Sequence, residues 1–128
     1  MRPHTVAAAD PFDLPDWLAT TAVTWAAETS MVAAPLVAGS LTGGATPQAC
    51  DVLAGDLAYP DPVLEDKWRS AAHQAWSLGE VLLVQYDGRM TLVVPGTAVT
   101  ADLVLDALRR LARAVAVPTE QFTVSLRL

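Results

Sequence analysis

The sequence predicts an α+β domain in which two helices pack on one face of a single sheet. Several short stretches alternate apolar and polar residues, an Asp-Gly pair joins two of them, and two longer stretches repeat with helical spacing. Antiparallel hairpins followed by helices favour one sheet over a doubly wound parallel sheet. We expect about five to six strands, antiparallel or at most mixed, in the order short helix, three strands, helix, hairpin, helix, strand.

The composition is that of a globular chain. Apolar residues make up 52% of the 128 residues and charged residues 17%, enough apolar surface to offset the entropy of ordering. The net charge of −6 repels phosphate backbones and anionic membranes, so neither a nucleic acid nor a membrane is expected as a partner. Ile and Asn are absent and Lys67 is the only lysine, which indicates the codon bias of a high-GC bacterium.

The N-terminal half carries the weaker patterns. Residues 1–12 are interpreted as a mobile tail and residues 13–128 as one domain, which begins with a short helix near Pro15. From Thr20 to Tyr59 the alternation around Trp25 favours three strands, although a four-residue repeat leaves a partly helical interpretation open. One cysteine, Cys50, permits no internal disulfide, and no signal peptide is recognised, so a cytoplasmic location is expected.

The C-terminal half predicts two helices around a hairpin. The first helix should open at Asp61-Pro62 and end at Gly79. Its expected core stripe consists of Leu64, Trp68, Ala71, Ala75 and Leu78. Asp87-Gly88 suits a type I′ turn that places Tyr86 opposite Arg89.

The remaining elements follow that hairpin. Thr100 can cap a second helix that runs to about Ala116. The last strand should span Gln121 to Leu128, with Phe122 and the apolar residues that alternate with it turned inward.

The second face of the hairpin is the candidate binding surface. Its apolar side chains should not face water in a sheet covered on one side, so either the N-terminal segment or another chain should cover them. Trp76 at the edge of the first helix and Arg89 are added because Trp and Arg often dominate interfaces. The candidate protein-binding residues are Leu82, Val84, Tyr86, Arg89, Val93 and Trp76. A homodimer through this face is expected, and a further protein partner is possible.

Motifs that would indicate catalysis are absent from the sequence. It contains no glycine-rich phosphate loop, no nucleophile elbow and no His-Glu-x-x-His, so no catalytic residue, metal site or cofactor is predicted. Cys50 and His73 could form a thiol dyad, but helical spacing turns His73 to solvent and Cys50 opens an apolar strand. The arginines at 109, 110 and 113 are interpreted as a solvated helix face.

The sequence therefore predicts a non-enzymatic protein-binding or accessory module that is homodimeric. The alternative is a small enzyme or small-molecule binder with a pocket near Asp56, Tyr59, Asp61 and His73. The expected element order and the acidity resemble the dimeric secretion chaperones of type III systems, from which the last strand departs. Likeness of element order does not carry function.

Overall fold

The chain folds into two mixed sheets and two α-helices. The computed structural model describes residues 5–10, 13–19, 21–31, 35–44, 46–56 and 64–127. The first sheet has the strand order β1 (Val6–Ala8), β7 (Leu82–Tyr86), β8 (Arg89–Val94), β6 (Asp51–Ala54) and β3 (Leu36–Val37). The second has the order β5 (Gln48–Ala49), β4 (Gly39–Thr42), β2 (Val23–Ala27) and β9 (Phe122–Ser125). The α+β class is confirmed, whereas the single sheet is wrong because its strands are divided between two.

Two parallel pairings make both sheets mixed. β6 runs parallel to β8, and β2 runs parallel to β9, while the other pairs are antiparallel. The helices are α1 (Asp66–Ser77) and α2 (Ala101–Ala114), and short 3₁₀ turns occur at η2 (Asp16–Ala19) and η3 (Thr119–Gln121). With the bent strands counted once, the elements follow the expected order after β1.

One bent hairpin connects the two sheets. β3 and β6 pair in the first sheet, and their continuations β4 and β5 pair in the second, with the change at Ala38 and Cys50. Trp25 of β2 is fully buried at this bend, where its indole N–H donates to the Cys50 carbonyl at 2.7 Å. Gly39 makes room for the ring, since a Cβ there would lie 2.4 Å from it. The bend thus depends on a tryptophan packed against a glycine.

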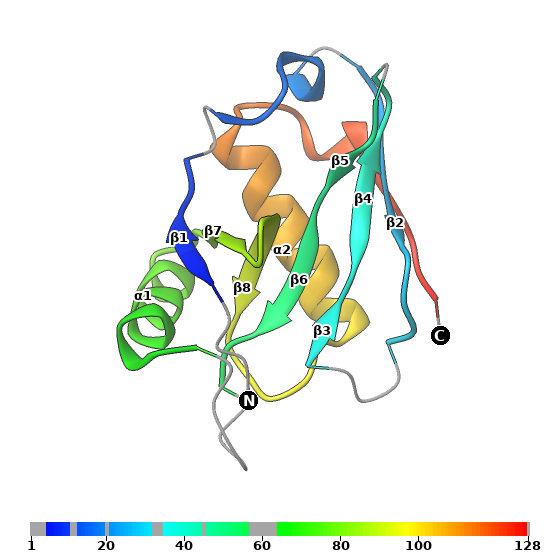
Figure 1. Cartoon of the computed structure of the whole chain (residues 1–128). Helices are drawn as coiled ribbons and strands as arrows, with labels where there is room; N and C mark the ends of the chain where they lie inside the picture. The colour runs from blue at the N-terminus through cyan, green and yellow to red at the C-terminus, as the bar shows by residue number, and fades with distance from the viewer. Residues whose placement is uncertain are drawn as a thin grey trace.

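The helices lie on opposite faces of the β7–β8 hairpin (Figure 1). α2 packs in the larger core cluster with Leu83 and Leu92, which point to one side of the hairpin. α1 belongs to a second cluster with Val84 and Val93, which point to the other side. The prediction that both helices share one face is therefore wrong. A sheet that is apolar on both faces needs cover on both, and here α1 supplies the second cover.

The hairpin itself agrees with its prediction. Tyr86 pairs with Arg89, and the turn residues Asp87 and Gly88 have φ angles of 51° and 81°, as a type I′ turn requires. The Thr100 hydroxyl caps α2 by accepting from the Leu103 N–H at 3.2 Å.

Other boundaries differ from the sequence prediction. α1 begins at Asp66, and the expected opening at Asp61 lies outside the described residues. Leu78, expected in the core, is 67% exposed because it follows the last turn of α1. In β9, Phe122 and Val124 pack against the core as expected, but the strand ends at Ser125.

The segment expected to be a mobile tail contains a strand. Within residues 1–12, Val6–Ala8 form β1, which pairs antiparallel with β7 at the edge of the five-stranded sheet. Two hydrogen bonds of 2.8 Å join Thr5 and Asp87 at the start of β1. The Thr5 N–H donates to the Asp87 carboxylate, and the Asp87 N–H donates to the Thr5 carbonyl. The residues of this segment are small and show little periodicity, so the sequence contains no strand signal here. Their strand conformation comes from pairing with β7.

Candidate functional site

The expected docking face of the hairpin is buried inside the chain. The exposed fractions of Val84, Tyr86 and Val93 are 0%, 4% and 0%. They pack with Ala72 of α1 in one cluster, against which Leu82 is partly buried. Since α1 already covers this face, a second subunit is not needed to cover it.

Arg89 makes an ion pair inside the chain. Its Nε and Nη2 donate to the two carboxylate oxygens of Asp51 at 2.9 and 3.0 Å, and Asp51 is only 3% exposed. The Gly39 N–H also donates to Asp51, at 3.1 Å, and Glu28 lies 3.7 Å from the guanidinium. The hydrogen bond to Asp51 is the main reason why the pKa of Arg89 is raised. The side chain thus neutralises a buried carboxylate beside the bend.

Trp76 is engaged by an arginine of the other helix. The Arg110 guanidinium carbon lies 3.6 Å from the centre of the indole ring, a cation–π contact. Arg110 also donates to the carbonyl oxygens of Trp76 and Glu80 at 2.8 and 2.7 Å, and to the Asp106 carboxylate at 3.1 Å. Arg110 therefore joins the end of α1, the start of β7 and α2.

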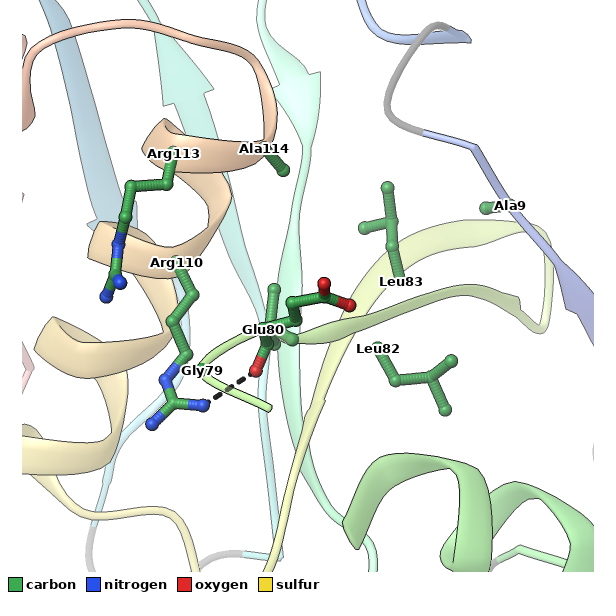
Figure 2. Close-up of a pocket in the computed structure, with 9 residues that line it drawn as sticks. Ala9, Gly79, Glu80, Leu82, Leu83, Arg110, Arg113 and Ala114 are labelled. Carbon is green, nitrogen blue, oxygen red and sulfur yellow. Dashed lines mark hydrogen bonds between the residues drawn. The ribbon is translucent and has the colours of Figure 1, made fainter. Parts of the chain in front are cut away.

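A groove opens next to this arginine. It has a volume of about 480 Å³ and lies between the last turns of α2 and the first residues of β7. Its lining residues are Ala9, Gly79, Glu80, Val81, Leu82, Leu83, Arg110, Arg113 and Ala114. Figure 2 shows the α2 residues along one wall and Leu82, Leu83 and Ala9 along the other, with Glu80 between them.

The groove combines an apolar lining with charges at its rim. Leu82 and Leu83 supply aliphatic surface, while Asp106 neutralises Arg110. Arg113 is exposed, and neither its guanidinium nor the Glu80 carboxylate has an ion-pair partner within the described ranges. A cation near a helix C-terminus is also favoured by the helix dipole. Chemically, this arrangement suits an apolar side chain that carries or neighbours a charged group.

A second candidate site brings together Asp56 and His73. The His73 Nε2 lies 2.8 Å from each Asp56 carboxylate oxygen, and the Gly96 N–H donates to one of them at 2.9 Å. Burial alone would raise the pKa of Asp56, but the Gly96 and His73 hydrogen bonds and the charges of His73 and Arg69 outweigh it, so that pKa is lowered.

The surroundings of this pair form an open hollow. Asp66, Arg69 and Ser70 of α1 line it, and an ion pair links Asp66 to Arg69. Tyr59 and Asp61, which the sequence placed in the same pocket, lie outside the described residues. Of the four residues that the sequence assigned to this pocket, the structure brings Asp56 and His73 into contact.

Cys50 is a structural residue. Its side chain is 1% exposed, and burial, followed by the charge of Asp51, raises the pKa of the thiol to about 12. A thiol with that pKa stays protonated at neutral pH and is a poor nucleophile. The described ranges hold no group of three or more His, Cys, Asp or Glu side chains able to bind a metal. Nor do they include a helix of the length and hydrophobicity needed to cross a membrane.

Comparison with protein-family models, with curated proteins and with solved structures finds no match for this chain. The likeness to secretion chaperones thus stays a prediction from element order. Sequence reasoning missed the groove because Ala9, Leu83 and Ala114 meet only in the folded chain. The spacing of Arg110 and Arg113 on one helix face was its only signal.

Proposed function

We propose that this chain is a non-enzymatic protein-binding module that holds an apolar segment of a partner in the groove between β7 and α2. The observation that carries the proposal is the groove of about 480 Å³ with an aliphatic wall and Arg113 at its rim. Pockets for small-molecule ligands have volumes of roughly 300–1,000 Å³ and combine apolar surface with a few polar groups. The groove has that size and composition.

The proposed surface replaces the hairpin face. Val84 and Val93 are fully buried under α1, so the reason for placing a second subunit there no longer holds. A homodimer remains a prediction from the sequence, and sedimentation over a range of concentrations tests it. Of the six residues predicted to bind a partner, Leu82 alone lines the groove.

Selection from a random peptide library tests the proposal and requires no assumption about the partner's sequence. Ala114→Trp should fill the groove, and Arg113→Glu should reverse the rim charge, so both variants should weaken the selected peptides. Arg109→Glu is the matched control because Arg109 makes the same charge change on α2 but lines a different hollow, next to β9. Peptides that bind wild type and Ala114→Trp equally would contradict the proposal.

A second candidate function rests on the contact between His73 and Asp56. A carboxylate that orients an imidazole, with the imidazole 54% exposed, is the arrangement of a general base. Hydrolysis of p-nitrophenyl acetate tests it, with His4→Gln as the control since the chain has two histidines. If the pair is a general base, His73→Gln and Asp56→Asn should both slow hydrolysis at pH 8. Equal rates in all variants would reduce the pair to a surface contact.

A further inference from the structure

We infer that β1 is an exchangeable edge strand: an extended segment of a partner takes its place on β7 and inserts a large apolar side chain where Ala9 now lies. The inference rests on the proposed function, because it names the occupant of the same groove. It commits to a peptide in extended conformation rather than to a helix or a small metabolite. Strand addition to a sheet edge is a common mode of peptide recognition, in which side-chain pockets give specificity.

The edge of β7 already holds an extended chain in a defined register. Val6 pairs with Tyr86 and Ala8 with Val84 in an antiparallel ladder. The ladder ends at Ala8, whereas β7 begins at Leu82, two residues beyond the Ala8 partner Val84. A longer strand on this edge would therefore continue along Leu83 and Leu82, where the groove lies.

β1 itself contributes little packing. It has three residues, of which Val6 is partly buried against the cluster under α1 while Ala7 and Ala8 are exposed. After Ala9 the chain leaves the edge, since the Asp10 carbonyl accepts a turn hydrogen bond from the Asp13 N–H at 2.9 Å. A strand fixed mainly by backbone hydrogen bonds and one valine can be replaced by a competitor with a better side chain.

A competing strand gains additional apolar contact at the position of Ala9. Extending the register of β1 by one residue sets position 9 opposite Leu83, and Ala9 packs against the α2 side of the core while lining the groove. Its methyl group leaves the groove open, whereas a phenylalanine or leucine at that position would extend into it. An acidic group next to that anchor would meet Arg113, whose guanidinium has no ion-pair partner among the residues the structure describes.

The probe is a synthetic peptide of residues 5–10 that carries Ala9→Phe, titrated into the full-length protein. Removing the Val6 side chain weakens β1, so Val6→Gly should raise the affinity for this peptide about fivefold. Ala9→Phe in the full chain lets the protein place its own phenyl ring in the groove, so the affinity for the peptide should fall about tenfold. Ala7→Phe adds the same side chain to β1 at a position that does not line the groove, and should not reduce the affinity.

Calorimetry gives the affinities, and circular dichroism confirms that each variant is folded. At saturation the backbone amide signals of Val6 to Ala8 should move to unpaired positions in the ¹⁵N spectrum. No binding to Val6→Gly at millimolar peptide would overturn the inference, and so would equal affinities for wild type, Val6→Gly and Ala9→Phe. The proposed function survives either result if Ala114→Trp still weakens the binding of library peptides. If Ala114→Trp has no effect on those peptides, the proposed function itself is wrong.

Discussion

The Arg89–Asp51 pair is a contact that the sequence did not predict. Arg89 lies on a β-hairpin next to apolar residues, which suggested an interface arginine, yet its Nε and Nη2 donate to a carboxylate that is 3% exposed. A buried charge needs a partner, because leaving it unpaired costs more than the pair gains. The ion pair therefore gives Arg89 a structural role at the bend.

Replacing this arginine should destabilise the fold. Arg89→Met leaves Asp51 without its cation and should cost about 2 kcal/mol, below the roughly 3–5 kcal/mol of fully buried pairs because the Arg89 side chain is 42% exposed. Adding Asp51→Asn should recover part of the loss, since an amide needs no cation. Urea unfolding measures both, with Arg109→Met as the control expected to stay within about 0.5 kcal/mol of wild type. Equal losses at 89 and 109 would refute this role.

The Asp56 carboxyl should add an acid-sensitive contribution to stability. Its pKa is lowered in the folded chain from an ordinary value of 3.8, so its contribution is present above that pH. The contribution is lost as pH falls through the lowered pKa, because the protonated acid has no negative charge to strengthen its hydrogen bonds with Gly96 and His73. Asp56→Asn should flatten this part of the profile when the free energy of unfolding is measured from pH 7 to pH 2. An unchanged acid slope would show that other carboxyls account for it.

At the scale of elements, two features divide the chain into its layers. The bend at Gly39 and Cys50 lets one hairpin serve both sheets, and α1 covers the hairpin face opposite α2. The bend depends on a large side chain packed closely against a small residue. The cover depends on hairpin side chains packed against a helix face. The bend should be the more sensitive of the two to substitution, because an indole ring is hydrogen-bonded to a backbone carbonyl there.

Gly39→Ala tests the bend. The added Cβ would lie 2.4 Å from the fully buried Trp25 ring, so the ring or the strand must move, and we expect a loss of about 3 kcal/mol. Gly79→Ala is the contrasting control, because it has a φ of 81° with open space and should cost only about 1 kcal/mol. Thermal unfolding of the two variants compares them. A smaller loss at Gly39 than at Gly79 would mean that the bend tolerates rearrangement.

Val84→Glu tests whether α1 or a second subunit covers the hairpin. Val84 is fully buried between β7 and α1, so a carboxylate there should prevent folding, at a cost above about 4 kcal/mol. Gln85→Glu changes the neighbouring, partly exposed residue and should be nearly neutral. Circular dichroism and sedimentation separate the outcomes. A Val84→Glu protein that is folded and monomeric would instead support an interface between subunits.

Local signals explain which elements the sequence predicts well. The Asp87-Gly88 turn and the Thr100 cap depend on neighbouring residues, and both agree with the structure. β1 could not be predicted, because Val6–Ala8 become a strand only through pairing with β7. The cover of the second hairpin face also escaped prediction, since helical periodicity does not say against which side of a sheet α1 packs.

The candidate sites show the same division. Asp56 and His73 lie in contact because they belong to consecutive elements, Asp56 just after β6 and His73 in α1. The groove depends on α2, β7 and the residue after β1 meeting at one place, which no local pattern reports. Arg110, interpreted as a solvated residue, instead holds those elements together through the carbonyls of Trp76 and Glu80.

At the scale of the whole molecule, the two candidate sites differ in the contacts that a ligand would gain or displace. The groove uses the edge of the five-stranded sheet, where β1 ends and α2 closes one wall. The hollow at His73 lies between α1 and the end of β6, and its polar groups already bond to one another. A ligand that enters the groove gains apolar contact, whereas one at His73 must first compete with the existing hydrogen bonds to Asp56. This comparison favours the groove as the binding site.

Chemical-shift mapping with a peptide selected from the library tests whether partners bind in the groove between β7 and α2. Titrated into ¹⁵N-labelled protein, the peptide should shift the backbone amide signals of Ala9, Leu82, Leu83 and Ala114, which line the groove. The signals of Asp56 and His73 should stay in place. Shifts centred on Asp56 and His73, with the groove signals unchanged, would contradict the account and move the binding site to the hollow on α1.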